Sequence, residues 1–150
     1  MTAELAPFTS ILVPYDGSDP SRSALKHALA LAHTGGKICI ITVVDEAPLM
    51  SASAASMMPY DPSALLVALD EEGTNELADA VNRCRARGIA PTTELVHDST
   101  VPAIMAAAAK HDCDLIVMGT HGRRGLARLI LGSTTDGVLR ASEIPVLVVR

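Results

Sequence analysis

The sequence predicts an α/β fold: a parallel sheet of five short strands, doubly wound by helices on both faces, in one domain over residues 1–150. Two observations lead to this prediction. Five short apolar runs alternate with segments of helical periodicity, and such alternation requires crossover connections, which favour parallel strands. Several runs are apolar throughout, as expected of strands buried on both faces. A length of 150 residues suits one domain of this kind.

Each expected strand is bounded by residues that end a sheet ladder or start a helix. The first strand ends at Pro14, which lacks a backbone donor. Residues 89–97 alternate more with polar side chains, as expected near a sheet edge. The apolar run at 115–118 closes on Gly119. The five strands are expected at residues 11–13, 37–44, 89–97, 115–118 and 145–150.

Capping residues and apolar periodicity place helices between the strands. Asp19-Pro20 begins the first as N-cap and first helical residue, and Asp61-Pro62 repeats this signal for the second. Gly73 is expected to weaken the second helix by roughly 1 kcal/mol relative to alanine. A third helix covers residues 101–110 after Asp98-Ser99-Thr100, and a fourth has Ser133 as its N-cap. The buried sides of the first two are assigned to Ala24, Leu25, Ala28, Leu29 and Leu31, and to Leu66, Leu69, Leu77, Val81 and Cys84.

Residues 46–60 (EAPLMSASAASMMPY) have no usable period and are expected to form a surface loop. Two interpretations of this loop stay open. Met50, Met57, Met58 and Tyr60 are suited to fold over a ligand as an apolar flap. The composition fits a disordered insertion equally well.

Composition narrows the classes of protein and partner. No apolar run approaches the eighteen or so residues that span a bilayer, and the first ten residues lack the features of a secretory signal, so we expect a cytoplasmic protein without a membrane partner. A net charge of −5, with one Phe, two Tyr and no Trp, argues against nucleic acid as a partner. Cys39, Cys84 and Cys113 are expected to be core residues rather than a disulfide or zinc set.

Positive charge gathers at one end of the chain, together with a glycine pattern. Residues 119–150 hold 5 basic and 2 acidic side chains, net +3, whereas residues 1–118 hold 7 basic and 15 acidic, net −8. Gly119 and Gly122 are followed, after nine intervening residues, by Gly132 and Ser133. Glycine lets a ligand approach the backbone, and a helix N-terminus offers N–H groups to an anion, so the pattern predicts a phosphate site that Arg123 suits. Glycines that serve only as turn residues, and arginines on a solvated surface, remain the alternative.

The spacing excludes two familiar nucleotide motifs. A Walker loop needs Gly-Lys-Ser/Thr, and the dinucleotide motif needs G-x-G-x-x-G, whereas the glycines here fall at 119, 122 and 125. The observed pattern resembles the nucleotide signature of the universal stress protein family. Nearly the whole chain is similar to a single-domain member of that family's nucleotide-binding branch. The resemblance is carried by VPYDGS (13–18), TVVDE (42–46), MGTHGRRGLARLILGST (118–134) and SEIPVLVV (142–149).

The resemblance implies the strand order 3-2-1-4-5, in a Rossmann-like sandwich similar to that of the adenine nucleotide alpha hydrolases. It implies ATP as ligand, with Mg²⁺ accompanying the phosphates, while cyclic AMP or another adenine ligand stays open. After its third strand the family commonly has Gly-x-Pro, where this chain has Asp98-Ser99-Thr100. The implied nucleoside contacts are Pro14, Asp16 and Val43, and the implied ribose and phosphate contacts are Met118, Gly119, Gly122, Gly132, Ser133 and Thr134, with Arg123 beside them.

Three functions remain in competition. The first is an ATP-binding regulatory module that changes shape or partners with nucleotide state in a stress response. The second is a slow ATPase or nucleotidyl transferase, although the glycine stretch offers only His121, Ser133, Asp136 and arginines as chemical groups. The third is an interaction dimer that binds no nucleotide. We also expect a homodimer joined through Val146–Val149, because an apolar edge strand invites association and the resemblance implies it.

Overall fold

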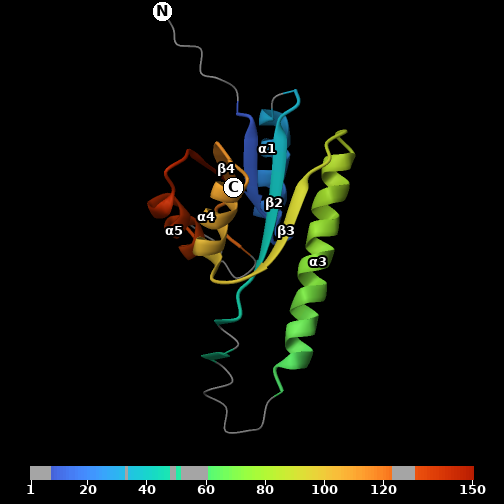
Figure 1. Cartoon of the computed structure of the whole chain (residues 1–150), viewed down its shortest axis with the longest axis vertical. Coiled ribbons are helices and arrows are strands. Elements are labelled where there is room, and N and C mark those ends of the chain that lie inside the picture. The colour runs from blue at the N-terminus through green and yellow to red at the C-terminus, as the bar shows by residue number, and fades with distance from the viewer. Residues whose placement is uncertain (1–7, 33, 48–49, 52–60, 123–130) are drawn as a thin grey trace, which may run out of the picture.

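The computed structural model describes residues 8–32, 34–47, 50–51, 61–122 and 131–150, and shows one sheet between two layers of helices (Figure 1). Strands and helices alternate along the chain, as predicted. Their order is β1 (Ser10–Pro14), α1 (Asp19–Leu31), β2 (Lys37–Val44), α3 (Ser63–Arg85), β3 (Thr92–His97), α4 (Thr100–Lys110), β4 (Leu115–Gly119), α5 (Ser133–Ala141) and β5 (Val146–Val149).

The sheet has five strands in the order β3-β2-β1-β4-β5, and every neighbouring pair is parallel. The predicted order is therefore confirmed. Leu12 of β1 pairs with Cys39 of β2 on one side and with Ile116 of β4 on the other, so β1 is the central strand. The chain leaves β1 toward β2 and returns past it to β4, which makes β1 and β4 the point where the strand order reverses. Ligand crevices in doubly wound sheets form beyond the strand ends at this point.

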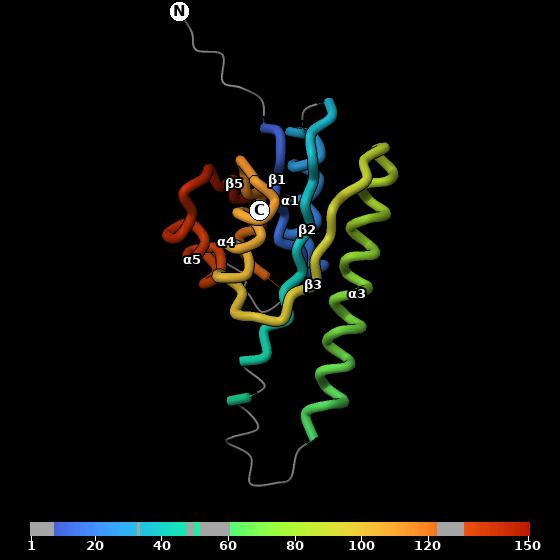
Figure 2. The backbone as a smooth tube through the Cα atoms, in the orientation of Figure 1, coloured from blue at the N-terminus to red at the C-terminus, as the bar shows by residue number. Residues whose placement is uncertain are grey.

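The helices cover opposite faces of the sheet (Figure 2). Alternate residues of β1 point to different layers. Ile11 and Val13 pack with α1 and α3, and Leu12 packs with α4 and α5. Because each strand contributes apolar side chains to both layers, the central strands read as continuous apolar runs. The prediction of strands buried on both faces is confirmed.

Several predicted boundaries and one buried position are wrong. Ser18, not Asp19, is the N-cap of α1, where its hydroxyl accepts from the Ser21 amide at 3.3 Å. Gly132, not Ser133, is the N-cap of α5. At α3 the N-cap is Pro62, so Asp61 lies one residue before the N-cap instead of at it. The Asp61 carboxylate accepts a hydrogen bond from the Ser63 amide at 2.9 Å. In each case the carbonyl that accepts the first backbone hydrogen bond of the helix belongs to the residue next to the predicted N-cap, namely Ser18, Pro62 or Gly132. Leu31 ends α1 and is 42% exposed instead of buried.

The third strand begins at Thr92 rather than at residue 89. The Ile89 amide instead donates to Cys84 O at 3.1 Å, which closes the end of α3. Gly88 between them has a φ of 73°, the left-handed conformation that commonly ends helices. The backbone just before Thr92 therefore makes a hydrogen bond to a carbonyl at the end of α3, and the hydrogen bonds of the sheet begin only at Thr92.

Gly73 lies where α3 crosses the sheet. It is buried, and a Cβ placed on it would lie 2.6 Å from Leu95 Cδ1 of β3. Glycine at this position lets helix and strand approach more closely than any other residue allows. Gly73 lowers the intrinsic helix propensity of α3, but it allows the helix to pack closely against β3.

Two further predictions concern the core and the loop at 46–60. Cys39, Cys84 and Cys113 are buried free thiols, as expected. Of the side chains assigned to an apolar flap, Met50 is exposed, and Met57, Met58 and Tyr60 lie outside the described residues. In the described part of the chain, no helix combines the length and the apolar character needed to cross a bilayer.

Candidate functional site

The carboxyl ends of β1, β2 and β4 bring the predicted site residues to one edge of the sheet. Pro14 is the last residue of β1, Val43 lies one residue before the end of β2, and Gly119 ends β4. Pro14 pairs with Ile41 in the register of β1 and β2. Met118 is buried in the layer of α4 and α5, and Val43 is partly buried against the same layer. The predicted nucleoside positions thus border the point where the strand order reverses.

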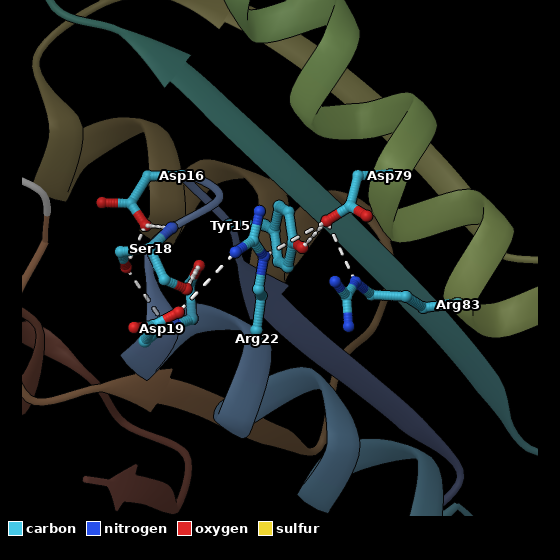
Figure 3. Close-up of polar contacts among 8 residues, drawn as sticks. Tyr15, Asp16, Ser18, Asp19, Arg22, Asp79 and Arg83 are labelled. Carbon is cyan, nitrogen blue, oxygen red and sulfur yellow. Dashed lines mark hydrogen bonds and ion pairs between the residues drawn. The ribbon is translucent and has the colours of Figure 1, made fainter.

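Asp16 follows β1 and is held in a fixed orientation. Its Oδ1 accepts from the Ser18 amide at 3.1 Å and from the Ser18 hydroxyl at 2.5 Å (Figure 3). Its Oδ2 is directed at Gly122, where an added Cβ would lie only 2.8 Å away. The glycine therefore lets the loop after β4 approach the carboxylate of the loop after β1. Two predicted site residues that are far apart in the sequence are in contact.

The start of α5 is fastened to the end of β4. The Gly132 amide donates to Thr120 O at 2.9 Å, and a Cβ on Gly132 would lie 3.0 Å from the same oxygen. The buried Thr135 hydroxyl donates to Gly119 O at 2.9 Å. Gly132 has a φ of −61°, so its need for glycine comes from this close approach and not from a left-handed backbone.

The first turn of α5 carries no side-chain cap, because its N-cap is glycine. Ser133 and Thr134 belong to this turn, the first exposed and the second half-buried. Uncapped first-turn amides, at the positive end of the helix dipole, are suited to an anion. Arg123, the remaining predicted phosphate contact, lies outside the described residues.

Gly119 has a structural role of its own. A Cβ on this residue would lie 2.6 Å from Pro20 Cβ and 2.8 Å from the Pro20 carbonyl carbon. The end of β4 therefore packs directly on the first turn of α1. This contact explains glycine at 119, as the approaches of Asp16 and Thr120 do at 122 and 132, but it involves the first turn of α1 rather than a loop at the sheet edge.

Sequence reasoning missed a network that ties α3 to Tyr15, the residue between the end of β1 and Asp16 (Figure 3). The buried Tyr15 hydroxyl donates to Asp79 of α3, and the Nε atoms of Arg83 and Arg22 lie 3.0 and 3.5 Å from the same carboxylate. Burial, and then the hydrogen bond to Asp79, raise the pKa of Tyr15 to about 12. The spacing of Asp79 and Arg83, four residues apart on one helix, was a signal for part of this network.

Glu76 is a second residue that the sequence did not single out. It is 9% exposed on α3, and its burial, followed by the charge of Asp16, raises its pKa to about 7. It lines a hollow of about 400 Å³ between α3 and the turn after β1. Glu71, Glu72 and Asp79 also line this hollow, and none of the predicted site residues that the structure describes does. So acidic a lining does not suit phosphate.

The described residues give no sign of a resident metal centre, since no three His, Cys, Asp or Glu side chains among them gather in a way that would hold a metal ion. His121, in the glycine stretch, has its Nδ1 2.9 Å from the Thr120 hydroxyl.

The strand order and the site at its reversal point place the chain in the class of doubly wound α/β domains. The model of the universal stress protein family matches residues 7–150, and the chain belongs to that family. The universal stress protein MJ0531 of Methanocaldococcus jannaschii is 35% identical over 146 residues, which cover 95% of this chain and 82% of that protein.

Solved structures agree in fold. MJ0577 of the same organism has a TM-score of 0.81 at 28% identity, with 95% of this chain and 96% of that chain covered. A universal stress family protein of Burkholderia pseudomallei has a TM-score of 0.75 at 33% identity, with 96% and 97% covered.

Two structures of the same fold contain adenine nucleotides. One is a universal stress protein in complex with cyclic AMP, at a TM-score of 0.59 and 24% identity, with 97% of this chain and 98% of that chain covered. The other is the universal stress protein of Archaeoglobus fulgidus in complex with dAMP, at a TM-score of 0.66 and 20% identity, with 96% and 99% covered. At these identities the likeness to the present chain is one of fold.

Proposed function

We propose that this universal stress protein binds ATP at the carboxyl ends of β1, β2 and β4 and acts as a nucleotide-dependent regulatory module in a stress response. One observation carries the proposal. Gly122 approaches Asp16 and Gly132 approaches Thr120 O, at the point where the strand order reverses, beside a helix start without a side-chain cap. If these glycines only formed turns, they would not need to lie so close to the loop after β1, at Asp16, and to the loop after β4, at Thr120.

The chemistry of the edge fits the parts of an adenine nucleotide. The uncapped first turn of α5, with Ser133 and Thr134, supplies amides and hydroxyls for phosphate oxygens. Asp16, oriented by Ser18, is a hydrogen-bond acceptor for a ribose hydroxyl or an amino group of the base. Val43 and Met118 offer aliphatic surface in a chain that has few aromatic residues. Mg²⁺ would arrive with the triphosphate, and the complexes of this fold with cyclic AMP and dAMP support the adenine class.

The regulatory output of the proposal requires a partner surface, and we place the self-association surface on β5. Within the described parts of the chain this strand pairs only with β4 and forms one edge of the sheet. Val146, Leu147 and Val148 are half-buried, so apolar side chains and ladder groups lie at the same edge. A second copy that pairs edge to edge would cover both.

Calorimetric titration of the purified protein with ATP, ADP, cyclic AMP and GTP tests the proposal, after any nucleotide that copurifies has been identified by mass spectrometry and removed. We expect saturable binding of ATP with a preference for adenine over guanine. Single-turnover hydrolysis measured in parallel separates a binding module from an enzyme. A protein that binds none of the four nucleotides, with Asp16 and the glycines intact, would reject the proposal.

A further inference from the structure

His97 is the last residue of β3, and its ring has a carboxylate at each nitrogen. Nδ1 lies 2.8 Å from Glu46 Oε1, in the segment after β2, and Nε2 lies 2.8 Å from Asp70 Oδ1 on α3. The three side chains come from three separate segments of the chain. They meet where β2 and β3 end, since Val44 pairs with His97 in the sheet register.

A neutral imidazole cannot satisfy both carboxylates. It has one N–H, and its other nitrogen is an acceptor. With the proton on Nδ1, the ring donates to Glu46, while the buried Asp70 Oδ1, which accepts no hydrogen bond among the described residues, faces an uncharged ring nitrogen at 2.8 Å. With the proton on Nε2, the lone pairs of Nδ1 and Glu46 Oε1 face each other at 2.8 Å. The arrangement therefore suits an imidazolium, which donates to Glu46 from Nδ1 and places its positive charge against Asp70 at Nε2.

The charges around His97 reinforce this state. From Ile38 to Asn82 the sequence contains no Lys, Arg or His, and eight acidic residues: Asp45, Glu46, Asp61, Asp70, Glu71, Glu72, Glu76 and Asp79. The acids closest in sequence to this cluster have other contacts or are exposed. Asp45 accepts from the Ala47 amide, Asp98 accepts from the Ser99 amide, and Glu71 is exposed. The hydrogen bond to Glu46, followed by the charge of Asp70, raises the pKa of His97.

Asp70 lies in the half of α3 that has little packing of its own. The amino-terminal half of the helix extends beyond the ends of β2 and β3 (Figure 1). The buried residues of α3 are Gly73, Glu76, Ala80 and Cys84, all of which follow Asp70. Val67, one turn before Asp70, is 56% exposed. Leu65, Leu66 and Leu69 are half-buried, so the contact with His97 attaches a stretch of helix that has no fully buried apolar side chain.

We propose that His97 is a proton-operated clasp that ties the amino-terminal half of α3, through Asp70, and the segment after β2, through Glu46, to the end of β3. When the ring carries both protons, the two carboxylates are held together and the helix start is fastened. Loss of one proton leaves the ring a single donor, and Asp70 is released. Because His97 binds its second proton more tightly in the folded state, this stabilisation is full below about pH 6.5, the ordinary pKa of histidine. It is lost as the pH rises through the higher value of the folded protein.

Side-chain NMR of the full-length, nucleotide-free protein tests the clasp directly. At pH 6 both ring nitrogens of His97 should carry protons, and the titration midpoint should lie above 6.5. Asp70→Asn should lower the midpoint by on the order of one pH unit, because it removes an opposite charge in contact with the ring. Glu71→Gln is the matched control, since it removes the neighbouring charge of the same helix without touching the ring, and its midpoint should stay near that of the wild type.

Amide hydrogen exchange supplies the structural readout. After correction for the intrinsic pH dependence of exchange, protection of residues 65–72 should fall as the pH rises through the His97 midpoint. His97→Gln should show the low protection at every pH, whereas residues 76–84 should stay protected in both proteins. A His97 midpoint at or below 6.5, or wild-type protection at pH 6 no higher than that of His97→Gln, would overturn the clasp. Neither measurement involves ATP, so the result is independent of the proposed nucleotide site.

Discussion

The most informative perturbation is a side chain at Gly122, because the structure relates this position directly to Asp16. A Cβ on residue 122 would lie 2.8 Å from Asp16 Oδ2, against 3.4 Å or more for ordinary van der Waals contact. The carboxylate is the flexible end of a side chain, so it can retreat, but retreat would break its hydrogen bonds to Ser18. Gly122→Val should therefore leave the fold intact and disturb the edge at which we place the nucleotide.

The size of the effect follows from affinity arithmetic. Displacing Asp16 and filling the approach to the loop should weaken ATP binding at least tenfold, which corresponds to about 1.4 kcal/mol. Ligand at a hundred times its Kd stabilises a protein by about 2.7 kcal/mol, and at ten times by about 1.4 kcal/mol. For a domain of this size, at about 2–4 °C per kcal/mol, the wild type should gain roughly 5–11 °C and the variant about half of that. Gly122→Ala should fall between them, since it adds the Cβ without the branches.

Thermal unfolding with and without ATP is the assay, and its controls are set by the structure. Ala141→Val adds the two branch methyls of valine at the exposed end of α5, away from the site, and should keep the full shift. Gly132→Val is a harsher variant, because its Cβ would lie 3.0 Å from Thr120 O, a backbone atom that also accepts from the Gly132 amide. It should lose stability even without nucleotide. A folded Gly122→Val protein that retains the whole ATP-induced shift would refute the reasoning, and the glycine would then serve only the turn.

Three further predictions concern assembly, catalysis and pH. Val148→Lys should convert a dimer to monomers, because it places a charge on the β5 edge. Thr93→Lys, on the opposite edge strand β3, should leave the dimer intact. Light scattering that shows a wild-type monomer at tens of micromolar protein would contradict the β5 interface. Steady-state ATP turnover should be far below about 10 per second, the ordinary enzyme range, and a rate within that range would replace the binding module by an enzyme. Glu76→Gln should be more stable than the wild type at pH 8. The raised pKa of Glu76, about 7, means that the folded protein favours the protonated carboxyl. The stability that this proton contributes is fully present below the ordinary pKa of a glutamate and is lost as the pH rises through 7. Denaturant unfolding at pH 5 and pH 8 measures this difference, and equal differences at the two pH values count against a buried Glu76.

Local sequence determined the strands, because a short apolar run without period can satisfy its backbone only inside a covered sheet. The run from Lys37 to Val44 was predicted with the bounds observed, and the glycine strand ends at Gly119 as expected. The order of the strands came from the family resemblance, since periodicity does not say which strands are neighbours. Capping signals located the helices but missed the N-caps of α1, α3 and α5 by one residue each; at α1 the adjacent Ser18 and Asp19 are both good caps.

Tertiary structure decided which residues of the site meet and why certain glycines are needed. Gly119 needs glycine because Pro20 of α1 approaches it, and at Gly73 the end of the Leu95 side chain of β3 occupies the space of a Cβ; sequence patterns do not reveal such contacts between distant elements. The same holds for the pairing of Tyr15 with Asp79. His97 looked like the polar end of an edge strand, and it became a candidate proton sensor only when folding placed Glu46 and Asp70 at its two nitrogens. Burial and hydrogen bonding between distant segments arise from the three-dimensional arrangement, whereas sequence patterns record which residues favour a strand, a helix or a turn.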